Sequence, residues 1–157
     1  MPVHTRFFLD SSQNLNPSGL QVAGPILNVE VSLPGSLAEI LSEKGDPIPA
    51  PAAGWVLLDT GASRACVDGE TISGLGVNPI GLVPVGSAAG QAQHSLYPAR
   101  LRFPAEGLDI DFSSVVSVDL TGQAVEGQPI IALIGRDLLA RCMLVYNGPG
   151  GFFTLAL

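Results

Sequence analysis

A carboxyl group follows an apolar run in the first half of the chain. Residues 55–58 are apolar, and Asp59-Thr60-Gly61-Ala62-Ser63 follows them directly. Such a run predicts a strand with both faces buried, and an ionised carboxylate at its end is costly unless another group pairs with it or shares its proton. Because glycine permits a tight turn, the pattern indicates a carboxyl group held on a rigid bend, a geometry suited to acid–base chemistry. A strand that ends in an ordinary turn has the same local pattern.

Hydrolysis of a peptide bond by carboxyl groups requires two of them near one water. One carboxylate takes a proton from the water, while the other, still protonated, polarises the scissile carbonyl. Two carboxyl groups that lie close together share one proton and titrate as a pair. The chain has no second Asp-Thr-Gly or Asp-Ser-Gly, since the tripeptide at Asp10 lacks the glycine and an extra residue follows Asp119. For this chemistry a second copy must supply the other Asp59, so we expect a homodimer with twofold symmetry.

A second motif, Leu133-Ile134-Gly135-Arg136-Asp137-Leu138-Leu139, occurs near the end of the chain. Together with Asp59-Thr60-Gly61-Ala62-Ser63 behind an apolar strand, it resembles the two signatures of the retropepsin-like aspartic proteases. Segment 37–56 is also similar to single-domain bacterial members, with a short helix and a proline-rich link. The resemblance covers residues 22–157, with 1–21 as an N-terminal arm or edge strand. It implies an all-β fold: a single-lobe, closed β-barrel with one or two short helices, homodimeric.

The resemblance also implies roles for the active-site loop. Asp59 is the expected catalytic acid and base, and Thr60 is expected to form a hydrogen bond across the twofold axis. Gly61 lets the substrate backbone approach and offers its carbonyl, and Ser63 contacts the substrate or its neighbours, while Ala62 belongs to the same loop.

The second motif is expected to support this loop. Ile134 ends a buried strand, and Gly135 packs beneath the loop where a side chain would not fit. Arg136 braces the loop or the interface through a partner that the sequence does not identify, because Ser63 occupies the position where retroviral enzymes often carry an acid. Asp137 is expected to cap or solvate a helix start, without a catalytic role.

Two extended segments, 82–85 and 93–103, predict a hairpin because small residues separate them. In retropepsin-like chains the hairpin at this place is the flap that closes over substrate, although an ordinary surface hairpin has the same composition. The expected flap tip consists of Gly86, Ser87, Ala88, Ala89 and Gly90.

The remaining pattern is typical of short strands. Alternation over 27–33 predicts a half-buried strand, and Ser36 with Glu39 fits a capping box for a helix that Gly45 closes. We expect a loop or arm at 11–19 and a short helix at 136–141. Further strands are expected at 3–9, 65–67, 108–112, 115–120, 130–134, 143–146 and 152–157, the last as a candidate dimer interface.

Composition limits the partners and the compartment. The 157 residues suit one domain, 13% charged and 46% hydrophobic, which favours a surface hidden in an oligomer. A net charge of −7 and scattered cations argue against nucleic acid or an anionic membrane as a partner. No apolar run is long enough to span a bilayer. Cys66 and Cys142 are expected to be reduced and small, and without a secretory pattern the chain is expected to be cytoplasmic.

Other chemistries have weak support. His4 and His94 are too isolated to form a metal site with the cysteines, and residues 86–90 lack the ending of a phosphate loop, so we expect no cofactor. A triad of Ser63, His94 and Asp59 lacks a nucleophile-elbow pattern.

Two function classes therefore stay open. The first is an aspartic endopeptidase that cuts a peptide or protein between apolar residues, bound by walls at Val56, Ile80, Leu82, Val85 and Ile131. The second is a catalytically silent module that keeps the fold for dimerisation or peptide binding. Neither the substrate, the working pH nor a cleaved pro-segment is indicated by the sequence.

Overall fold

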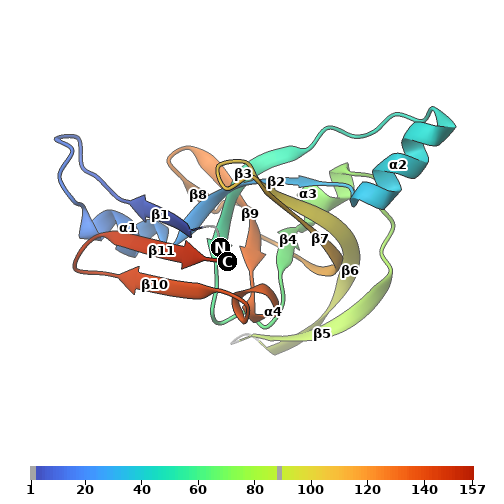
Figure 1. Cartoon of the computed structure of the whole chain (residues 1–157). Helices are drawn as coiled ribbons and strands as arrows, with labels where there is room; N and C mark the ends of the chain where they lie inside the picture. The colour runs from blue at the N-terminus through green and yellow to red at the C-terminus, as the bar shows by residue number, and fades with distance from the viewer. Residues whose placement is uncertain (1–2, 88–89) are drawn as a thin grey trace.

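The computed structural model describes residues 3–87 and 90–157, which form a β-barrel with a smaller sheet beside it (Figure 1). Six strands of the barrel are hydrogen-bonded in the order β2-β3-β9-β4-β7-β6, and β6 pairs back onto β2. This last pairing closes the sheet, so the predicted all-β closed barrel is confirmed. The six strands are β2 (Ile26–Ser32), β3 (Ala52–Leu58), β9 (Gln128–Ile134), β4 (Cys66–Asp68), β7 (Leu108–Val118) and β6 (Gly90–Phe103).

Side chains that alternate along the strands fill the barrel. In β2, Leu27, Val29 and Val31 are buried and Asn28 is exposed, which is the period of two expected from the sequence. In β3, Trp55 and Val56 are both buried, as predicted for a central strand. Each such apolar side chain contributes about 1.5–3 kcal/mol through removal from water, so the barrel supplies the rigid base of the loops at its ends.

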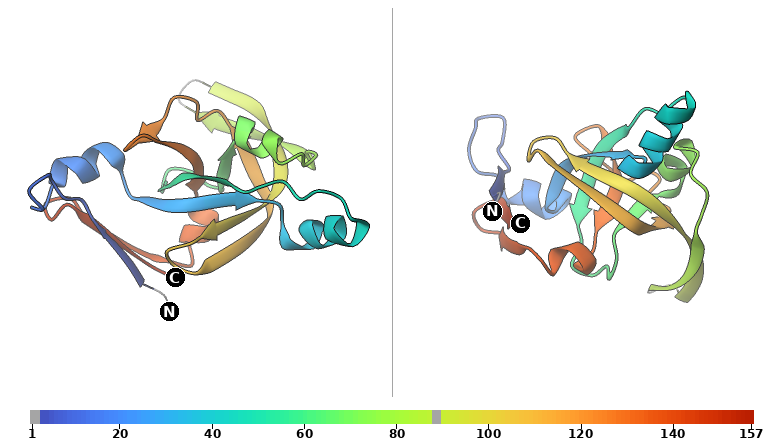
Figure 2. Two further views of the ribbon diagram at one scale, coloured as in Figure 1. Left: turned by 90° about the horizontal axis from the view of Figure 1, so that it is seen from above. Right: turned by 45° about the vertical axis from the view of Figure 1, so that its right-hand side comes forward.

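A three-stranded antiparallel sheet carries both chain ends. Its order is β1 (Val3–Phe7), β11 (Phe152–Ala156) and β10 (Met143–Asn147). Figure 2 shows it on one side of the barrel, opposite the helix α2 (Gly35–Lys44). Phe153 and Leu155 of β11 point into the core. Because β1 and β10 occupy both edges of β11, the segment 152–157 cannot extend a sheet into a second copy, contrary to our expectation from the sequence.

The N-terminal segment contains a helix where the sequence predicted a loop. Helix α1 (Pro17–Ala23) begins after Asn16, whose side chain accepts a hydrogen bond from Gly19 N–H at 3.1 Å. Proline at the first helical position suits this start, and Leu20 is fully buried. The expected division between 1–21 and 22–157 falls inside this helix, and β1 pairs with β11, so residues 3–21 pack as part of the same body.

Four short helices occur in the described ranges, rather than the expected one or two. The sequence located α2 and α4 (Arg136–Leu139) but missed α1 and α3 (Gly69–Gly74). The Asp68 side chain caps α3 by accepting the Thr71 N–H at 3.2 Å. The helix spans six residues, too few for a periodic apolar pattern to predict it.

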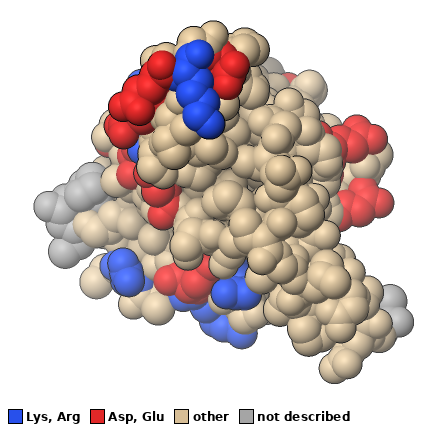
Figure 3. Space-filling view, turned by 90° about the vertical axis from the view of Figure 1, so that its right-hand side faces the viewer, with Lys and Arg blue, Asp and Glu red and all other residues tan. Residues whose placement is uncertain are grey.

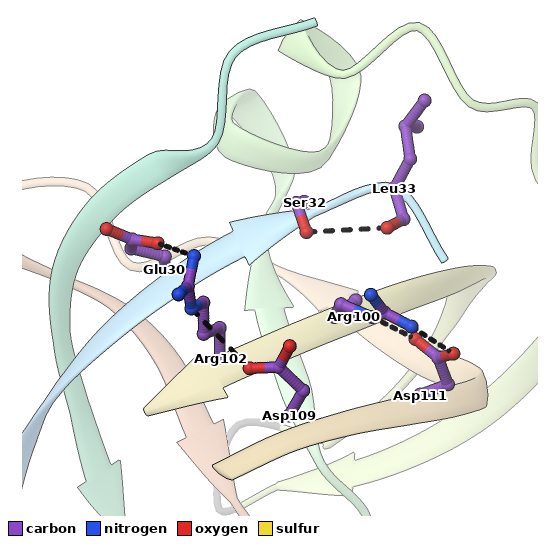
Figure 4. A network of polar contacts seen from close by, with 7 residues as sticks. All are labelled: Glu30, Ser32, Leu33, Arg100, Arg102, Asp109 and Asp111. Carbon is purple, nitrogen blue, oxygen red and sulfur yellow. Dashed lines mark hydrogen bonds and ion pairs between the residues drawn. The ribbon is translucent and has the colours of Figure 1, made fainter. Parts of the chain in front are cut away.

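The N-terminus of α2 is capped by another strand instead of by Ser36. The helix begins at Gly35 after Pro34, and no side chain of its own caps it. The Asp111 carboxylate of β7 accepts the Gly35 N–H and pairs with Arg100 of β6, with Nε–Oδ1 at 2.7 Å and Nη2–Oδ2 at 2.8 Å (Figure 4). The hydrogen bond from Arg100 lowers the pKa of Asp111 below its usual value. The predicted capping box is therefore wrong, whereas Gly45 closes the helix in the left-handed conformation as expected.

The hairpins of the barrel partly follow the sequence prediction. Strand β5 (Gly81–Ser87) pairs antiparallel with β6, which confirms the predicted hairpin. Strand β7 is continuous where two strands were expected, and a short strand, β8 (Ala124–Val125), pairs with β9. None of the helices that the structure describes is long and apolar enough to cross a bilayer.

The cap on α2 can be tested with two alanine substitutions. Asp111→Ala should fray the first turn of α2, because Gly35 N–H loses its acceptor, and should cost at most about 1 kcal/mol since the pair is largely exposed. Ser36→Ala, in the same turn, should change neither the fraying of the first turn nor the free energy of unfolding. Amide exchange over residues 35–38 and urea unfolding measure both effects, and equal exchange in the two variants would contradict the assignment of Asp111.

Candidate active site

The parallel pairing of β3 and β9 brings the two sequence motifs together. Leu58 lies opposite Ile134 in the register, and Asp59 N–H continues the ladder by donating to the Ile134 carbonyl at 2.9 Å. The loop after β3 and helix α4 after β9 therefore leave the same end of the barrel, at the bottom of Figure 1. Asp59 and Gly135, far apart in sequence, become neighbours through this one pairing.

The Asp59 carboxyl group is half-buried and has one oxygen fixed. Gly61 N–H donates to Oδ1 at 2.8 Å, and Ala62 N–H donates to the Asp59 carbonyl at 3.2 Å, which closes the tight turn. Oδ2 receives no hydrogen bond from the residues that the structure describes. The loop therefore orients the carboxyl group and leaves one oxygen open for another group.

Arg136 braces the active-site loop through its backbone. Its Nη1 donates to the carbonyls of Thr60 at 2.7 Å and Gly61 at 3.0 Å, and its own N–H donates to the Ala62 carbonyl at 2.9 Å. These three bonds identify the partner that the sequence left open. Because a guanidinium is planar and stays charged, the two bonds from Nη1 hold the loop in one conformation.

Gly135 makes the close approach between the two motifs possible. A Cβ atom at this position would lie 2.5 Å from the backbone carbon and oxygen of Arg64. The φ angle of −88° suits any residue, so the need for glycine comes from space and not from backbone strain. The strand end therefore packs directly beneath the loop.

Asp137 is a second brace, which the sequence identified only as the start of a helix. Its Oδ2 accepts the Ala65 N–H at 2.8 Å, and its Oδ1 accepts the Leu138 N–H at 2.9 Å. Both carboxylate oxygens are thus occupied by backbone donors. The only signal in the sequence was the position of an acid in the first turn of a helix, which does not show that it reaches back to the loop.

Cys66 lies close to these acids but is poorly suited to act as a nucleophile. Burial raises the pKa of its thiol to about 11, and the charges of Asp137 and Asp59 add to the effect. Burial also raises the pKa of Cys142. The reactive form of cysteine is the thiolate, so neither thiol is activated. Cys66 is buried, as the sequence predicted, whereas Cys142 is only partly buried.

The other residues of the expected site are exposed or lie outside the described residues. Thr60 and Ser63 are exposed, and neither side chain has a hydrogen bond to the part of the chain that the structure describes. At the expected flap tip, Gly86 is exposed, while Ala88 and Ala89 lie outside the described residues. Ser87 and Gly90 form the last pair of the β5–β6 ladder, so the hairpin exists, whereas its closure over substrate stays a prediction.

Two of the expected cleft walls are wrong. Val56 and Ile131 are 0% and 5% exposed and belong to the core, because both faces of β3 and β9 are covered at these positions. Ile80 and Leu82, at the start of β5, are 59% and 67% exposed, and Val85 is half-buried. On the side of the molecule where β5 runs, charged side chains gather over α2 at the top, above a broad uncharged surface (Figure 3).

Metal-ligating side chains do not converge among the described residues. No group of three or more His, Cys, Asp or Glu side chains there is placed to hold an ion. His94 lies with Nδ1 2.8 Å from the Ser117 carbonyl, on a strand rather than near Asp59 in the ladder.

Substituting the glycine beneath the loop tests how the site is held. Gly135→Ala should destabilise the fold by about 1–3 kcal/mol or more, because the added methyl group meets backbone that cannot move aside cheaply. Gly74→Ala, at the end of α3 with open space around its Cβ position, is the matched control and should be neutral or slightly stabilising. Thermal unfolding of both variants measures the difference in stability. Equal melting temperatures would show that Gly135 does not pack tightly against the Arg64 backbone.

The comparisons with known proteins find a similarity in structure but none in sequence. The sequence matches no family model and no curated protein. Among solved structures, the chain is similar to a retropepsin-like aspartic protease from Rickettsia conorii, with 14% identity, a TM-score of 0.47, and coverage of 98% of this chain and 90% of that chain. In its two motifs and in its closed six-stranded barrel, the chain resembles a retropepsin-like aspartic protease.

Proposed function

We propose that the protein is an aspartic endopeptidase that works as a homodimer. The observation that carries this proposal is the state of Asp59, which stands on a tight turn with Oδ1 held by Gly61 N–H and Oδ2 open. A catalytic carboxyl group must be oriented and still reach a water. The brace from Arg136 to the Thr60 and Gly61 carbonyls supplies the rigidity that preorganisation requires.

The chemistry follows from two such carboxyl groups facing one water. The ionised Asp59 takes a proton from the water as it attacks the scissile carbonyl carbon, and the protonated one donates a hydrogen bond to the carbonyl oxygen. Two carboxyls at short distance favour a single shared proton because both cannot ionise cheaply. The roles of acid and base are then assigned by where that proton lies.

The second carboxyl group comes from a second copy in this proposal. The nearest alternative within the braced motif is Asp137, but backbone N–H groups bind both of its oxygens. An isologous dimer places Asp59 opposite its own equivalent without any further motif. Thr60 is exposed, and in this dimer it would form the hydrogen bond between the two loops.

The exposed edge of β10 is the surface that we assign to the dimer. Met143 and Val145 are 68% and 46% exposed, and the strand contains neither a charged residue nor proline, the usual protections of an edge strand. It follows α4, which carries Arg136, after three residues. The opposite edge of the sheet, β1, carries His4 and Arg6. Antiparallel pairing of two β10 edges about a twofold axis would satisfy their backbone groups.

The substrate proposed is an extended peptide segment with apolar residues at the cut. Ile80 and Leu82 on β5 present exposed apolar side chains on the hairpin that would cover such a segment. An extended peptide can bind through its main chain, with side-chain contacts setting the preference. Free cysteines at positions 66 and 142 suit a reducing compartment, so we place the enzyme in the cytoplasm.

Cleavage of a diverse peptide mixture tests the activity. Mass spectrometry from about pH 3.5 to about pH 7.5 should find cuts between apolar residues, and Asp59→Asn should abolish them while the circular dichroism spectrum stays unchanged. Asp119→Asn removes an exposed acid whose hydrogen bonds come from the Thr121 N–H and side chain, and it should leave the cuts intact. No cuts from the wild-type dimer at any pH would favour a silent dimerisation or peptide-binding module.

Charge placed on the β10 edge tests the assembly. Val145→Lys should shift the protein from dimer to monomer at micromolar concentration, because like charges would adjoin across the twofold axis, and cleavage should fall with it. Val22→Lys introduces the same charge at a residue that is 87% exposed on α1 and should leave the dimer intact. Analytical ultracentrifugation distinguishes dimer from monomer in both variants. A wild-type protein that is monomeric at micromolar concentration would contradict the proposal.

A further inference from the structure

The two motif segments carry a formal charge of opposite sign to the rest of the chain. The sequence has seven Lys and Arg against fourteen Asp and Glu. Segments 59–64 and 133–141 lie at the same end of the barrel, because β3 pairs with β9 (bottom of Figure 1). They contain three of the cations and two of the acids, which gives +1, whereas the remaining four cations and twelve acids give −8. An excess of positive charge therefore coincides with the end that carries Asp59.

The cations of this end are Arg64, Arg136 and Arg141, and none of them forms an ion pair with the residues that the structure describes. Each other arginine of the chain pairs with an acid: Arg6 with Glu126, Arg100 with Asp111, and Arg102 with Glu30 and Asp109. Arg136 donates to two carbonyls, which are neutral and leave its charge uncompensated. The positive charge of this end can therefore act on a group from outside the chain.

Arg64 combines a fixed backbone with an unengaged side chain. Its backbone lies against Gly135, and the following N–H, that of Ala65, donates to Asp137 Oδ2 at 2.8 Å. Arg64 is exposed, and its guanidinium has no hydrogen bond to the described part of the chain. A guanidinium can bind a carboxylate through two parallel N–H···O bonds, and a fixed backbone reduces the freedom lost on binding. In the same loop as Asp59, this side chain is suited to recognise an acid on a bound segment.

We propose that the segment bound at this site carries acidic residues beside the apolar residues at the cut, and that Arg64 is the residue that recognises them. The inference rests on the proposed function, since the segment is the substrate of the two Asp59 loops. In that dimer, six arginines would accompany four acids, one of them protonated, which gives a net charge of +3 at the site. Such a site attracts anionic groups and repels cationic ones. Because the rest of each chain is negative, the attraction acts at the site and not over the whole surface.

Two matched peptides test this preference in cleavage and in binding. Both are extended and have apolar residues at the centre, flanked by Glu in one peptide and by Gln in the other. The wild type should cut the acidic peptide with a KM roughly threefold to tenfold lower and a similar kcat. Raising the salt concentration from about 0.05 M to about 0.5 M should remove most of this difference. Fluorescence anisotropy should show the same preference in binding to Asp59→Asn, which does not cut.

Charge reversal at two positions separates Arg64 from the net charge of the protein. Arg64→Glu should reverse the preference, so that a third peptide with Lys in the flanking positions binds more tightly than the acidic one. Lys44→Glu changes the net charge equally at the end of α2, away from the loops (Figure 1), and should retain the wild-type preference. If Arg64→Glu does not fold, Arg64→Gln serves instead, and it should bind the acidic and neutral peptides equally.

The outcomes distinguish this inference from the protease activity. Cuts without a preference for the acidic peptide, or a preference that the Arg64 variants leave unchanged, would overturn the inference and leave the protease in place. A preference in binding without any cuts would support the role of Arg64 and contradict the protease. A wild type that neither binds nor cuts the acidic peptide would overturn the inference, as would loss of the preference in Lys44→Glu.

Discussion

The parallel pairing of β3 with β9 is the constraint on which the site depends. It places the end of one buried strand beside the end of another, and Gly135 then packs against the Arg64 backbone where a methyl group would not fit. Because the strands are fixed by a closed barrel, the loop that carries Asp59 has little freedom. Arg136 and Asp137 complete this arrangement by binding backbone groups on either side of the turn. The Asp59 carboxyl group is therefore oriented by backbone groups of its own loop rather than by water.

In the proposed dimer, each chain provides half of a carboxyl site. Each acid that lies near the loop is either Asp59 or is saturated by backbone donors, as Asp137 is. A rigid loop of this kind cannot fold over to supply its own second carboxyl group. In the same proposal the two copies meet through the small sheet, where β11 is enclosed by its neighbours and β10 presents an uncharged edge.

The energetic contribution of a charged pair in this structure depends on how deeply the pair is buried. Arg100 and Asp111 are largely exposed, so their pair contributes little energy (Figure 4), and Asp111 serves mainly to cap the start of α2. The Glu106 side chain is almost fully buried, with His4 Nδ1 2.6 Å from its Oε1, and removing one partner of a buried pair leaves the other charge uncompensated at a larger cost.

The sequence by itself determined the elements whose signals are local. Alternation located β2, the apolar run located β3, the glycine-bounded segments located the β5–β6 hairpin, and the two motifs identified Asp59, Gly135 and Arg136. Tertiary structure alone decided the features that join distant residues. The cap of α2 comes from Asp111 on another strand, the brace of Arg136 goes to the carbonyls of Thr60 and Gly61, and Val56 and Ile131 are buried instead of lining a cleft. The physical reason is that periodicity and turn chemistry act over a few neighbouring residues, whereas burial and hydrogen-bond partners depend on which strands the closed barrel brings together.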